Sequence, residues 1–465
     1  MRPFAFVFKQ TSRAVFIACL FLLGCGDDDA PLPTPDAGRI DGGGSFDGSG
    51  SFDLGPGDAG EPPGPSLAPL AETPRLAVVL SDFTSTSIGM LRADGSAIDA
   101  RWMTSGTTLP GLVAALSGDV VLASRPLATD GYLTILDRFR TDVATRVRVP
   151  DGRVRGQVRT HEAAGAGGTG FSSNPHDFVY IGPDEAWVSR SEPNLDPTAP
   201  AAERGTDLYR IDPTSMRRVG ERIDLTSGDV MVDVVDATSG VTRSEVAHGR
   251  PSAIVRLGNI LLVGLGRFTL TFGGTGSGAV AAVDILSREV TILPIPGLKG
   301  CASVSAVPAD SEHAVVACAP FGDPAASGFA VLHVGTSGVE VERVFRFAEF
   351  PSTPLAANNV VALSSRLVVA SVYGTFDPPS GDQLYTLDLT TGSSTMIATS
   401  TGGFALGQGA YDPTTRRLFV PDAEEDAPRL RRFDRSAAGS FLEGTATTLA
   451  PELGLPPRRV YLLGE

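Results

Sequence analysis

The sequence predicts an all-β protein, a seven-bladed β-propeller of four-stranded antiparallel blades, preceded by a signal peptide and a disordered linker. Three observations support this prediction. A strand-and-turn phrase recurs along the chain, sustained helical periodicity is almost absent, and the composition is dense in turn formers, with 54 Gly and 35 Pro among 465 residues. Average usage of these two residue types is roughly 12%, so the excess indicates a turn-rich fold, a flexible segment, or both.

The recurring phrase is an apolar strand that ends in Asp and runs into a turn, as in QLYTLDLTTG and AVAAVDILSR. Its Asp suits a strand end because the carboxylate accepts a hydrogen bond from the backbone N–H two residues on, which closes an Asx-turn. These residues are therefore expected to be structural and not catalytic. The seven copies start at Gly89, Tyr132, Asp207, Ala279, Phe329, Gln383 and Arg429. The strand-ending residues are Asp94, Asp137, Asp212, Asp284, Gly335, Asp388 and Asp434.

Each phrase is preceded by two strand-like runs and followed by one, which predicts four strands for each blade. The first unit lacks its first strand, and an orphan strand, RRVYLL, spans 458–463 near the C-terminus. We therefore expect the C-terminal strand to supply the innermost strand of blade 1 and to close the ring.

The N-terminal 24 residues have the pattern of a signal peptide. Basic residues Arg2, Lys9 and Arg13 precede an apolar run that is shorter than the roughly 20 residues needed to cross a bilayer. Leu22-Leu23-Gly24-Cys25 resembles the lipobox of bacterial lipoproteins, which implies that Cys25 becomes a lipidated N-terminus. An ordinary secretory signal with an incidental cysteine is the alternative. The resemblance implies an exported lipoprotein, anchored to a membrane of the bacterial cell envelope, with the outer membrane or cell surface favoured over the inner membrane.

Residues 25–72 are expected to form a disordered acidic tether behind that cysteine, rich in Gly and Pro and poor in large apolar groups. Residues 73–465 then form the propeller domain. The formal net charge of −15 argues against a nucleic-acid partner, because phosphate binding requires clustered Lys and Arg.

Two cysteines remain in the folded part, Cys301 and Cys318. The turn residues between them are centred at the midpoint of the two cysteines, so a symmetric hairpin places them directly opposite one another. Export permits oxidation, and we expect a disulfide; two buried free thiols are the alternative.

Signatures of familiar enzyme chemistry are missing from the folded region. There is no G-x-S-x-G nucleophile elbow, and the five histidines form no H-x-x-x-H pattern. The Gly-rich run at 273–278 precedes a strand and does not open a helix, so we interpret it as a blade loop. No metal and no cofactor are expected, and no catalytic residue can be assigned.

One group of polar residues does suggest a ligand site. In a propeller, the loops leading into the innermost strands gather around the central channel on one face, where ligands commonly bind. Polar side chains at these positions come from four of the blades, and polar residues without a function are the alternative. The candidate channel-mouth residues are Asn174, His176, Asp177, His248, Arg250, Asn358, Asn359 and Gln408.

The strand-Asp-turn phrase resembles the repeats of YVTN/YncE-like bacterial surface propellers over about residues 75–463, although no Tyr-Val-Thr-Asn string occurs. Our first hypothesis is a non-catalytic, lipid-anchored module that binds protein, peptide or polysaccharide, and we expect a monomer. The alternative is a propeller enzyme of the lactonase or quinoprotein kind that uses His176, Asp177 and Arg250. A divalent ion or quinone held by inward carboxylates would favour the enzyme.

Overall fold

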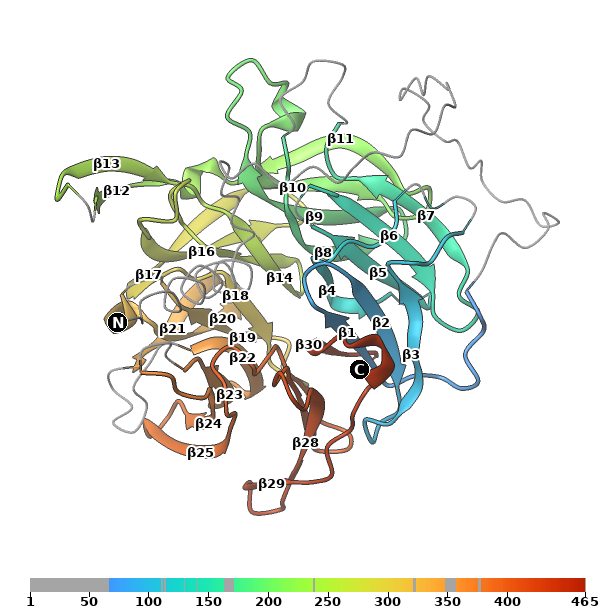
Figure 1. Cartoon of the computed structure of the whole chain (residues 1–465). Coiled ribbons are helices and arrows are strands. Elements are labelled where there is room, and N and C mark those ends of the chain that lie inside the picture. The colour runs from blue at the N-terminus through green and yellow to red at the C-terminus, as the bar shows by residue number, and fades with distance from the viewer. Residues whose placement is uncertain are drawn as a thin grey trace, which may run out of the picture. The chain divides into compact units, whose positions relative to one another are not determined.

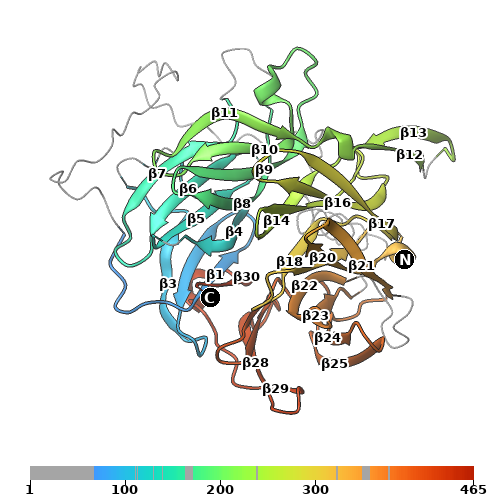
Figure 2. The ribbon, with the colours of Figure 1, turned by 180° about the vertical axis from the view of Figure 1, so that it is seen from behind.

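The computed structural model describes residues 67–464, apart from 110–111, 113, 129, 139, 163–170, 237–238, 321–322, 348–356 and 375–377. Seven four-stranded antiparallel sheets follow one another around a central axis (Figure 1), and the same ring is seen from behind in Figure 2. The predicted fold class is confirmed. The helices of the described part are single 3-10 turns, η1 (Ala201–Glu203), η2 (Thr226–Gly228), η3 (Pro324–Ala326) and η5 (Pro451–Leu453).

Blades 1 to 4 comprise the following strands. Blade 1 contains β1 (Leu76–Ser81), β2 (Thr86–Leu91), β3 (Ala97–Thr104) and β30 (Pro457–Leu462). Blade 2 contains β4 (Val120–Leu127), β5 (Tyr132–Asp137), β6 (Val143–Arg148) and β7 (Val154–Arg159). Blade 3 contains β8 (Pro175–Gly182), β9 (Glu185–Pro193), β10 (Gly205–Asp212) and β11 (Arg217–Asp224). Blade 4 contains β14 (Pro251–Leu257), β15 (Ile260–Leu265), β16 (Ser277–Asp284) and β17 (Val290–Lys299).

The remaining three blades complete the ring. Blade 5 contains β18 (Ser303–Ala306), β19 (His313–Cys318), β20 (Gly328–Gly335) and β21 (Gly338–Arg346). Blade 6 contains β22 (Ala357–Ser364), β23 (Leu367–Val372), β24 (Gln383–Asp388) and β25 (Ser393–Thr399). Blade 7 contains β26 (Ala410–Asp412), β27 (Arg417–Asp422), β28 (Arg429–Arg435) and β29 (Phe441–Glu443).

The innermost strands lie against one another around the axis in the order β30, β4, β8, β14, β18, β22 and β26. We call the face on which these strands begin the upper face, and the opposite face the lower face. Apolar side chains between adjacent blades form the core, since each cluster of buried residues combines strands of neighbouring sheets.

The ring is closed by the C-terminal strand, as predicted. Strand β30 pairs antiparallel with β1, from Leu76 opposite Leu462 to Leu80 opposite Pro457. It also bonds to blade 7, where the Gln408 N–H donates to the Arg458 carbonyl at 3.1 Å. Blade 1 therefore combines strands from opposite ends of the described chain.

Blade 2 differs from the predicted order of strands. Its phrase, which ends at Asp137, forms β5, the second strand, whereas the phrase forms the third strand in the other blades. The run before β4 forms no strand, because Gly118 lies against the blade 1 turn and its carbonyl accepts a hydrogen bond from Ser81 Oγ at 2.7 Å. A Cβ at Gly118 would lie 2.1 Å from the Phe83 carbonyl carbon, so this contact requires glycine.

The predicted Asx-turns are confirmed in four of the copies, where the carboxylate accepts from the N–H two residues on. They are formed by Asp94, Asp212, Asp284 and Asp388. The prediction is wrong for Asp434, which pairs with Arg417. It is not tested for Asp137, which accepts hydrogen bonds from Ser117, because residue 139 lies outside the described residues. Both remain structural residues.

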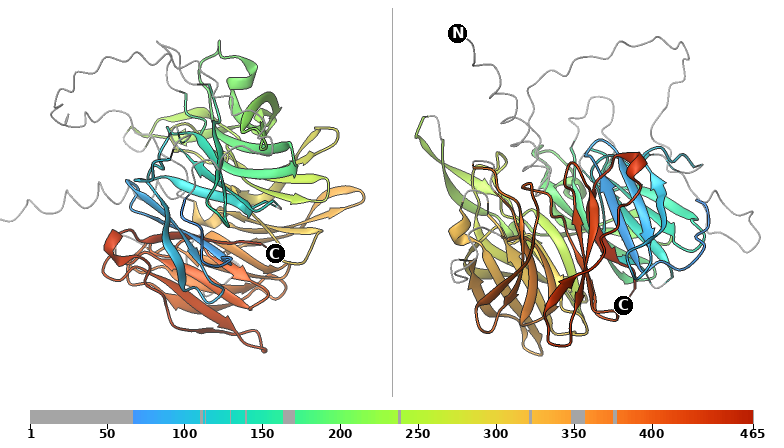
Figure 3. Two further views of the ribbon diagram at one scale, coloured as in Figure 1. Left: turned by 90° about the vertical axis from the view of Figure 1, so that its right-hand side faces the viewer. Right: turned by 60° about the horizontal axis from the view of Figure 1, so that its bottom comes forward.

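A two-stranded hairpin, β12 (Val230–Val235) and β13 (Thr242–Ala247), lies between blades 3 and 4 and extends beside them (Figure 3). The Gly-rich run at 273–278 packs against it. A Cβ at Gly274 would lie 2.7 Å from Val234 Cγ2, and one at Gly276 would lie 2.5 Å from Val230 Cγ2. The glycines therefore allow close approach of the hairpin.

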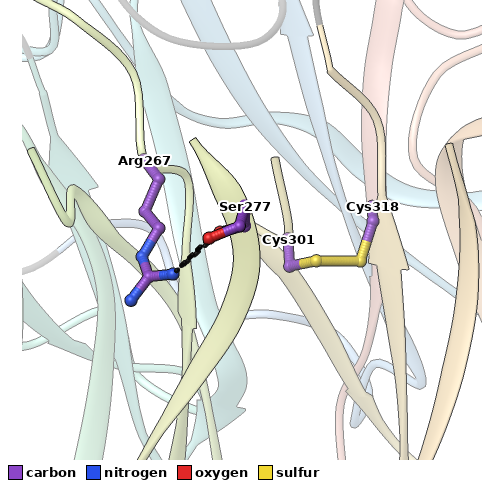
Figure 4. Close-up of a disulfide and its surroundings, with 4 residues drawn as sticks. All are labelled: Arg267, Ser277, Cys301 and Cys318. Atoms are coloured by element: carbon purple, nitrogen blue, oxygen red, sulfur yellow. Dashed lines mark hydrogen bonds between the residues drawn. A yellow bond between two sulfur atoms is a disulfide. The ribbon is translucent and has the colours of Figure 1, made fainter. Parts of the chain in front are cut away.

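Cys301 and Cys318 form a disulfide in the structure (Figure 4). The register of β18 and β19 pairs Ser303 with Ala317, so the symmetric placement of the two cysteines is wrong by one residue. Cys318 ends β19, whereas Cys301 precedes β18 and forms an isolated bridge with Leu265 of blade 4. The disulfide thus holds the connection between blades 4 and 5 to the second strand of blade 5.

The described chain begins at Leu67, before the expected domain boundary at residue 73. Leu67 is buried in the core between blades 1 and 2, and its N–H donates to the Gly152 carbonyl at 2.9 Å. The predicted signal peptide and the lipidation at Cys25 lie outside the described residues. No helix within the described part is long and apolar enough to cross a membrane.

Candidate functional site

The predicted channel-mouth residues lie at or next to the starts of four innermost strands, on the upper face. Asn174, His176 and Asp177 are at the start of β8, His248 and Arg250 precede β14, Asn358 and Asn359 are at the start of β22, and Gln408 precedes β26. The side chain of Asn358 is outside the described part of the structure.

Both carboxylate oxygens of Asp177 accept hydrogen bonds, and the donors belong to blades 2, 3 and 4. Its carboxylate accepts from the N–H groups of Ser124 in β4, Ile254 in β14 and its neighbour Phe178, each at 2.7–2.8 Å, and from Ser124 Oγ. Burial raises the pKa of Asp177 to about 6, against the hydrogen bonds that lower it. With four donors around it, this carboxylate clamps blades 2, 3 and 4 together, and it has no oxygen lone pair directed at a ligand.

Asn174 and Arg250 meet at a third residue that the sequence did not suggest. Glu192 Oε1 accepts from Arg250 Nη1 at 2.5 Å and from Asn174 Nδ2 at 3.4 Å. Both Asn174 and Arg250 have positive φ angles, 47° and 46°, at the bends that lead into their strands. The Arg250 guanidinium also lies over the Phe272 ring, 4.4 Å from its centroid. This is a neutralised, buried junction between blades 3 and 4.

His248 is held by an acid in the same way. Its Nδ1 lies 3.1 Å from Asp229 Oδ2, and Asp229 Oδ1 accepts from the Gly249 N–H at 2.7 Å. His248 therefore positions the segment between the β12–β13 hairpin and β14.

His176 has a partner within the described part of the chain at only one of its two ring nitrogens. Its Nδ1 lies 3.0 Å from Ser252 Oγ, but its buried Nε2 has no partner within the described part of the chain. Burial, together with the charges of Arg138, Arg459 and Arg250, holds the pKa of His176 well below its ordinary value. The imidazole is neutral at physiological pH and keeps one polar atom for a further partner.

The residues of blades 6 and 7 form a separate group. Gln408 Nε2 donates to the Val360 carbonyl at 3.1 Å, and Asn359 Nδ2 lies 3.5 Å from the Leu406 carbonyl. Tyr373, at the end of β23, is hydrogen-bonded to Asn359, and burial raises the Tyr373 pKa. The amides thus join the inner strands of blades 6 and 7.

Arg459, on the closing strand β30, acts electrostatically on a residue of each of these two groups. Its charge lowers the pKa of His176 in blade 3 and also that of Tyr373 in blade 6, so it is in electrostatic range of opposite sides of the ring. The half-buried Arg459 side chain makes no ion pair or hydrogen bond within the described part of the chain. The nearby arginines differ, because Arg138 is paired with Asp119 and Arg250 with Glu192.

Arg459 is not among the predicted channel-mouth residues, because it belongs to the closing strand and not to a loop that leads into a complete blade. The signal was present in the sequence, since the predicted closing strand starts with two arginines, Arg458 and Arg459. Arg458, in contrast to Arg459, has partners within the protein. It donates to the Ser81 carbonyl at 3.0 Å and lies over the Phe83 ring, and burial lowers its pKa to about 10.

Among the described residues, no group of three or more His, Cys, Asp or Glu side chains could hold a metal ion. At the upper face the donor set is basic and amide-rich, and the buried Asp177 and the half-buried Glu192 already accept hydrogen bonds from the protein. What the arrangement offers is a positive charge and a neutral imidazole nitrogen.

Comparison with known proteins identifies similar folds among solved structures but assigns the chain to no family. No family model matches the chain, and no curated protein matches it. Among solved structures, a Lactobacillus plantarum protein is 13% identical with a TM-score of 0.51, covering 84% of this chain and 100% of that one. A putative 6-phosphogluconolactonase from Bacteroides fragilis is 11% identical (TM-score 0.46; 85% and 100% covered). The periplasmic gluconolactonase of Pseudomonas aeruginosa is 13% identical (TM-score 0.48; 84% and 99% covered). The chain has the fold of the Lactobacillus plantarum protein.

Proposed function

We propose that this propeller is a non-catalytic binding module for an anionic, carboxylate-bearing ligand, an acidic peptide segment or an acidic polysaccharide, on the upper face of the ring. The observation that carries the proposal is Arg459, a half-buried cation on the closing strand with no carboxylate partner within the described part of the chain. Its neighbours Arg138 and Arg250 each have one.

The chemistry of the surrounding groups supports an anion. A guanidinium binds a carboxylate through two parallel N–H donors, and such charge-assisted bonds are stronger than neutral ones. The unpartnered Nε2 of His176 and the amides of Asn359 and Gln408 supply polar groups for the rest of the ligand. A neutral ligand would leave the Arg459 charge uncompensated.

The enzyme alternative finds less support in the same residues. A general base or a metal ligand must present an open carboxylate oxygen to the reacting group. Asp177, on which that alternative depended, presents both oxygens to protein donors from three blades. Substituting it would loosen the ring before it changed any chemistry.

We further propose, from the resemblance at residues 22–25, that the propeller is exported and attached to the cell envelope through lipid on Cys25 and the acidic tether. An acidic tether is repelled by acidic partners, which leaves the basic upper face as the part of the molecule suited to an anion. We propose a monomer.

The test measures binding of the purified full chain to polygalacturonate and to a glutamate-rich peptide by calorimetry. Dextran and a lysine-rich peptide serve as neutral and cationic controls. We expect saturable binding of at least one anionic probe and a loss of roughly tenfold or more in affinity for Arg459→Gln, the cost of one charge-assisted contact. Arg101→Gln, an exposed arginine on β3, is the matched control and should bind normally.

Equal binding by wild type and Arg459→Gln would overturn the assignment of the site, and binding of dextran alone would overturn the anionic ligand. Hydrolysis of a gluconolactone by the wild-type chain would overturn the non-catalytic proposal.

A further inference from the structure

Three arginines on the outer rim of blade 2 have no carboxylate partner within the described part of the chain. Arg153, Arg155 and Arg159 lie on or next to β7, the outermost strand of that blade (Figure 1). Arg155 Nε donates to the Thr214 carbonyl at 2.6 Å, and Arg159 Nη1 lies 3.5 Å from the Thr141 carbonyl. A carbonyl accepts a hydrogen bond without cancelling the charge of the guanidinium, so the rim keeps three uncompensated positive charges.

This part of the chain is basic, although the protein as a whole is acidic. Residues 119–159 contain eight Arg and five Asp, whereas the whole chain has a formal net charge of −15. The acid next to the rim in the sequence is already paired, since Asp151 lies 3.2 Å from Arg148 and accepts from the Arg153 N–H at 3.3 Å. A local excess of positive charge on a surface strand attracts a negatively charged partner.

The acidic tether joins the ring beside these arginines. Leu67, the first described residue, donates its N–H to the Gly152 carbonyl at 2.9 Å, and Gly152 directly precedes Arg153. This contact requires glycine, because a Cβ at Gly152 would lie 2.5 Å from Leu67 Cβ. The point at which residues 26–66 leave the ring is therefore fixed at the start of β7.

Residues 26–66 have the charge and the length to cover the rim. They contain nine carboxylates and a single base, Arg39. An extended chain spans at most about 3.6 Å per residue, so Glu61 lies within about 22 Å of Leu67 and Asp58 within about 32 Å. Strand β7 has six residues and is about 20 Å long. The nearest acids of the tether can therefore reach every arginine of the rim.

We propose that the acidic tether docks through residues 26–66 against Arg153, Arg155 and Arg159 on the outer rim of blade 2. Each exposed ion pair is weak, but the covalent link holds the carboxylates at an effective concentration on the order of millimolar, so that several weak pairs act together. A docked tether shortens the span between residue 25 and the ring, and high ionic strength lengthens it. The inference is independent of the proposed function, because it uses none of the candidate site residues and requires no lipid.

The test cross-links the purified full chain with a carbodiimide, which joins an amine to a carboxylate in contact with it. Lys9 and Lys299 are the only lysines of the sequence, so Arg153→Lys adds a single amine to the rim and keeps the charge. We expect this variant to form cross-links within one chain to acids of residues 26–66, which mass spectrometry locates. Their yield should fall several-fold in about 0.5 M NaCl, where the screening length is about 4 Å.

The matched control is Arg92→Lys. Arg92 pairs with Glu72 at 2.5 Å, and Glu72 is within about 18 Å of Leu67 along the chain, so this amine is also close to the tether but belongs to a paired cation. We expect cross-links from Arg92→Lys to Glu72 and not to residues 26–66. Equal cross-linking of residues 26–66 by both variants, no such cross-link from Arg153→Lys, or cross-linked dimers in place of internal links would each overturn the proposal.

A second variant removes the charges of the rim. Arg153→Gln, Arg155→Gln and Arg159→Gln combined should release the tether and increase the radius of gyration of the full chain in small-angle X-ray scattering at low ionic strength. Arg92→Gln should leave the radius unchanged. Equal radii for the wild type and the combined variant would contradict docking on this rim.

Discussion

Two sides of the upper face differ in how their polar groups are paired. Most polar groups of blades 3 and 4 have partners within the protein, although His176 Nε2 has none among the described residues. On the side of blades 3 and 4, Asp177 accepts four hydrogen bonds, Arg250 is paired with Glu192, and His248 with Asp229. On the side of the closing strand, Arg459 has neither an ion pair nor a side-chain hydrogen bond within the described part of the chain.

We therefore expect the paired groups of blades 3 and 4 to contribute to the stability of the fold, and Arg459 to contribute to the proposed binding of a ligand. A buried polar group that is fully paired holds its neighbours in place, and leaving its partners unpaired costs free energy. A half-buried charge without a partner contributes little to the fold and remains available to a ligand. The contrast leads to three predictions, given from the largest expected effect to the smallest.

Deletion of residues 456–465 should have the largest effect, because it removes the innermost strand of blade 1. The deletion breaks the pairing with β1 and the bonds to blade 7, and it removes the buried Val460 and Leu463 from the core. We expect a loss of at least about 5 kcal/mol in the free energy of unfolding. Chemical denaturation and limited proteolysis measure it, and an unchanged melting temperature would contradict the closure by β30.

Asp177→Asn should destabilise the protein by about 2–4 kcal/mol, because an amide presents one donor where two oxygens now accept from four donors. Arg459→Gln, the matched substitution on the other side of the upper face, should change stability by no more than about 0.5 kcal/mol. Urea denaturation of both variants at pH 7.5 tests the contrast. Equal losses in the free energy of unfolding for Asp177→Asn and Arg459→Gln would contradict the difference between the two sides of the upper face.

His176→Asn should change how stability depends on pH. Burial keeps His176 neutral in the folded protein, whereas the unfolded chain takes up a proton as the pH falls below 6.5. The wild type therefore loses stability in acid relative to the variant, whose Asn side chain keeps a group near Ser252 but does not titrate. The difference should grow by up to about 1.4 kcal/mol per pH unit below that value. A constant difference from pH 7.5 to 5 would show that His176 takes up its proton over the same pH range in the folded and unfolded states, which would contradict its lowered pKa.

Most of the fold could be predicted from the sequence because the strand-and-turn phrase is local. Seven phrases gave seven blades, and the orphan strand gave the closure. The predicted order of strands in blade 2 was wrong because an apolar strand that ends in Asp can be the second strand of a blade as well as the third. The contact that decides the order, Gly118 against the turn at Phe83, joins two blades and leaves no local pattern.

The site could be predicted only in part. The predicted strand starts indicated where the polar residues lie. Whether a side chain is already hydrogen-bonded within the protein depends on partners in other blades, such as Ser124 and Ile254 around Asp177. Glu192 lies at the end of its strand and carried no signal.

The closing strand also determines when the ring can form. Arg458 and Ser81, which it joins by a hydrogen bond, are 377 residues apart in the sequence. Because synthesis proceeds from the N-terminus, blade 1 lacks its innermost strand until the other six blades have been made. The nascent chain therefore remains an open arc whose first blade exposes an unpaired edge, and the upper face acquires Arg459 only in the last step of assembly.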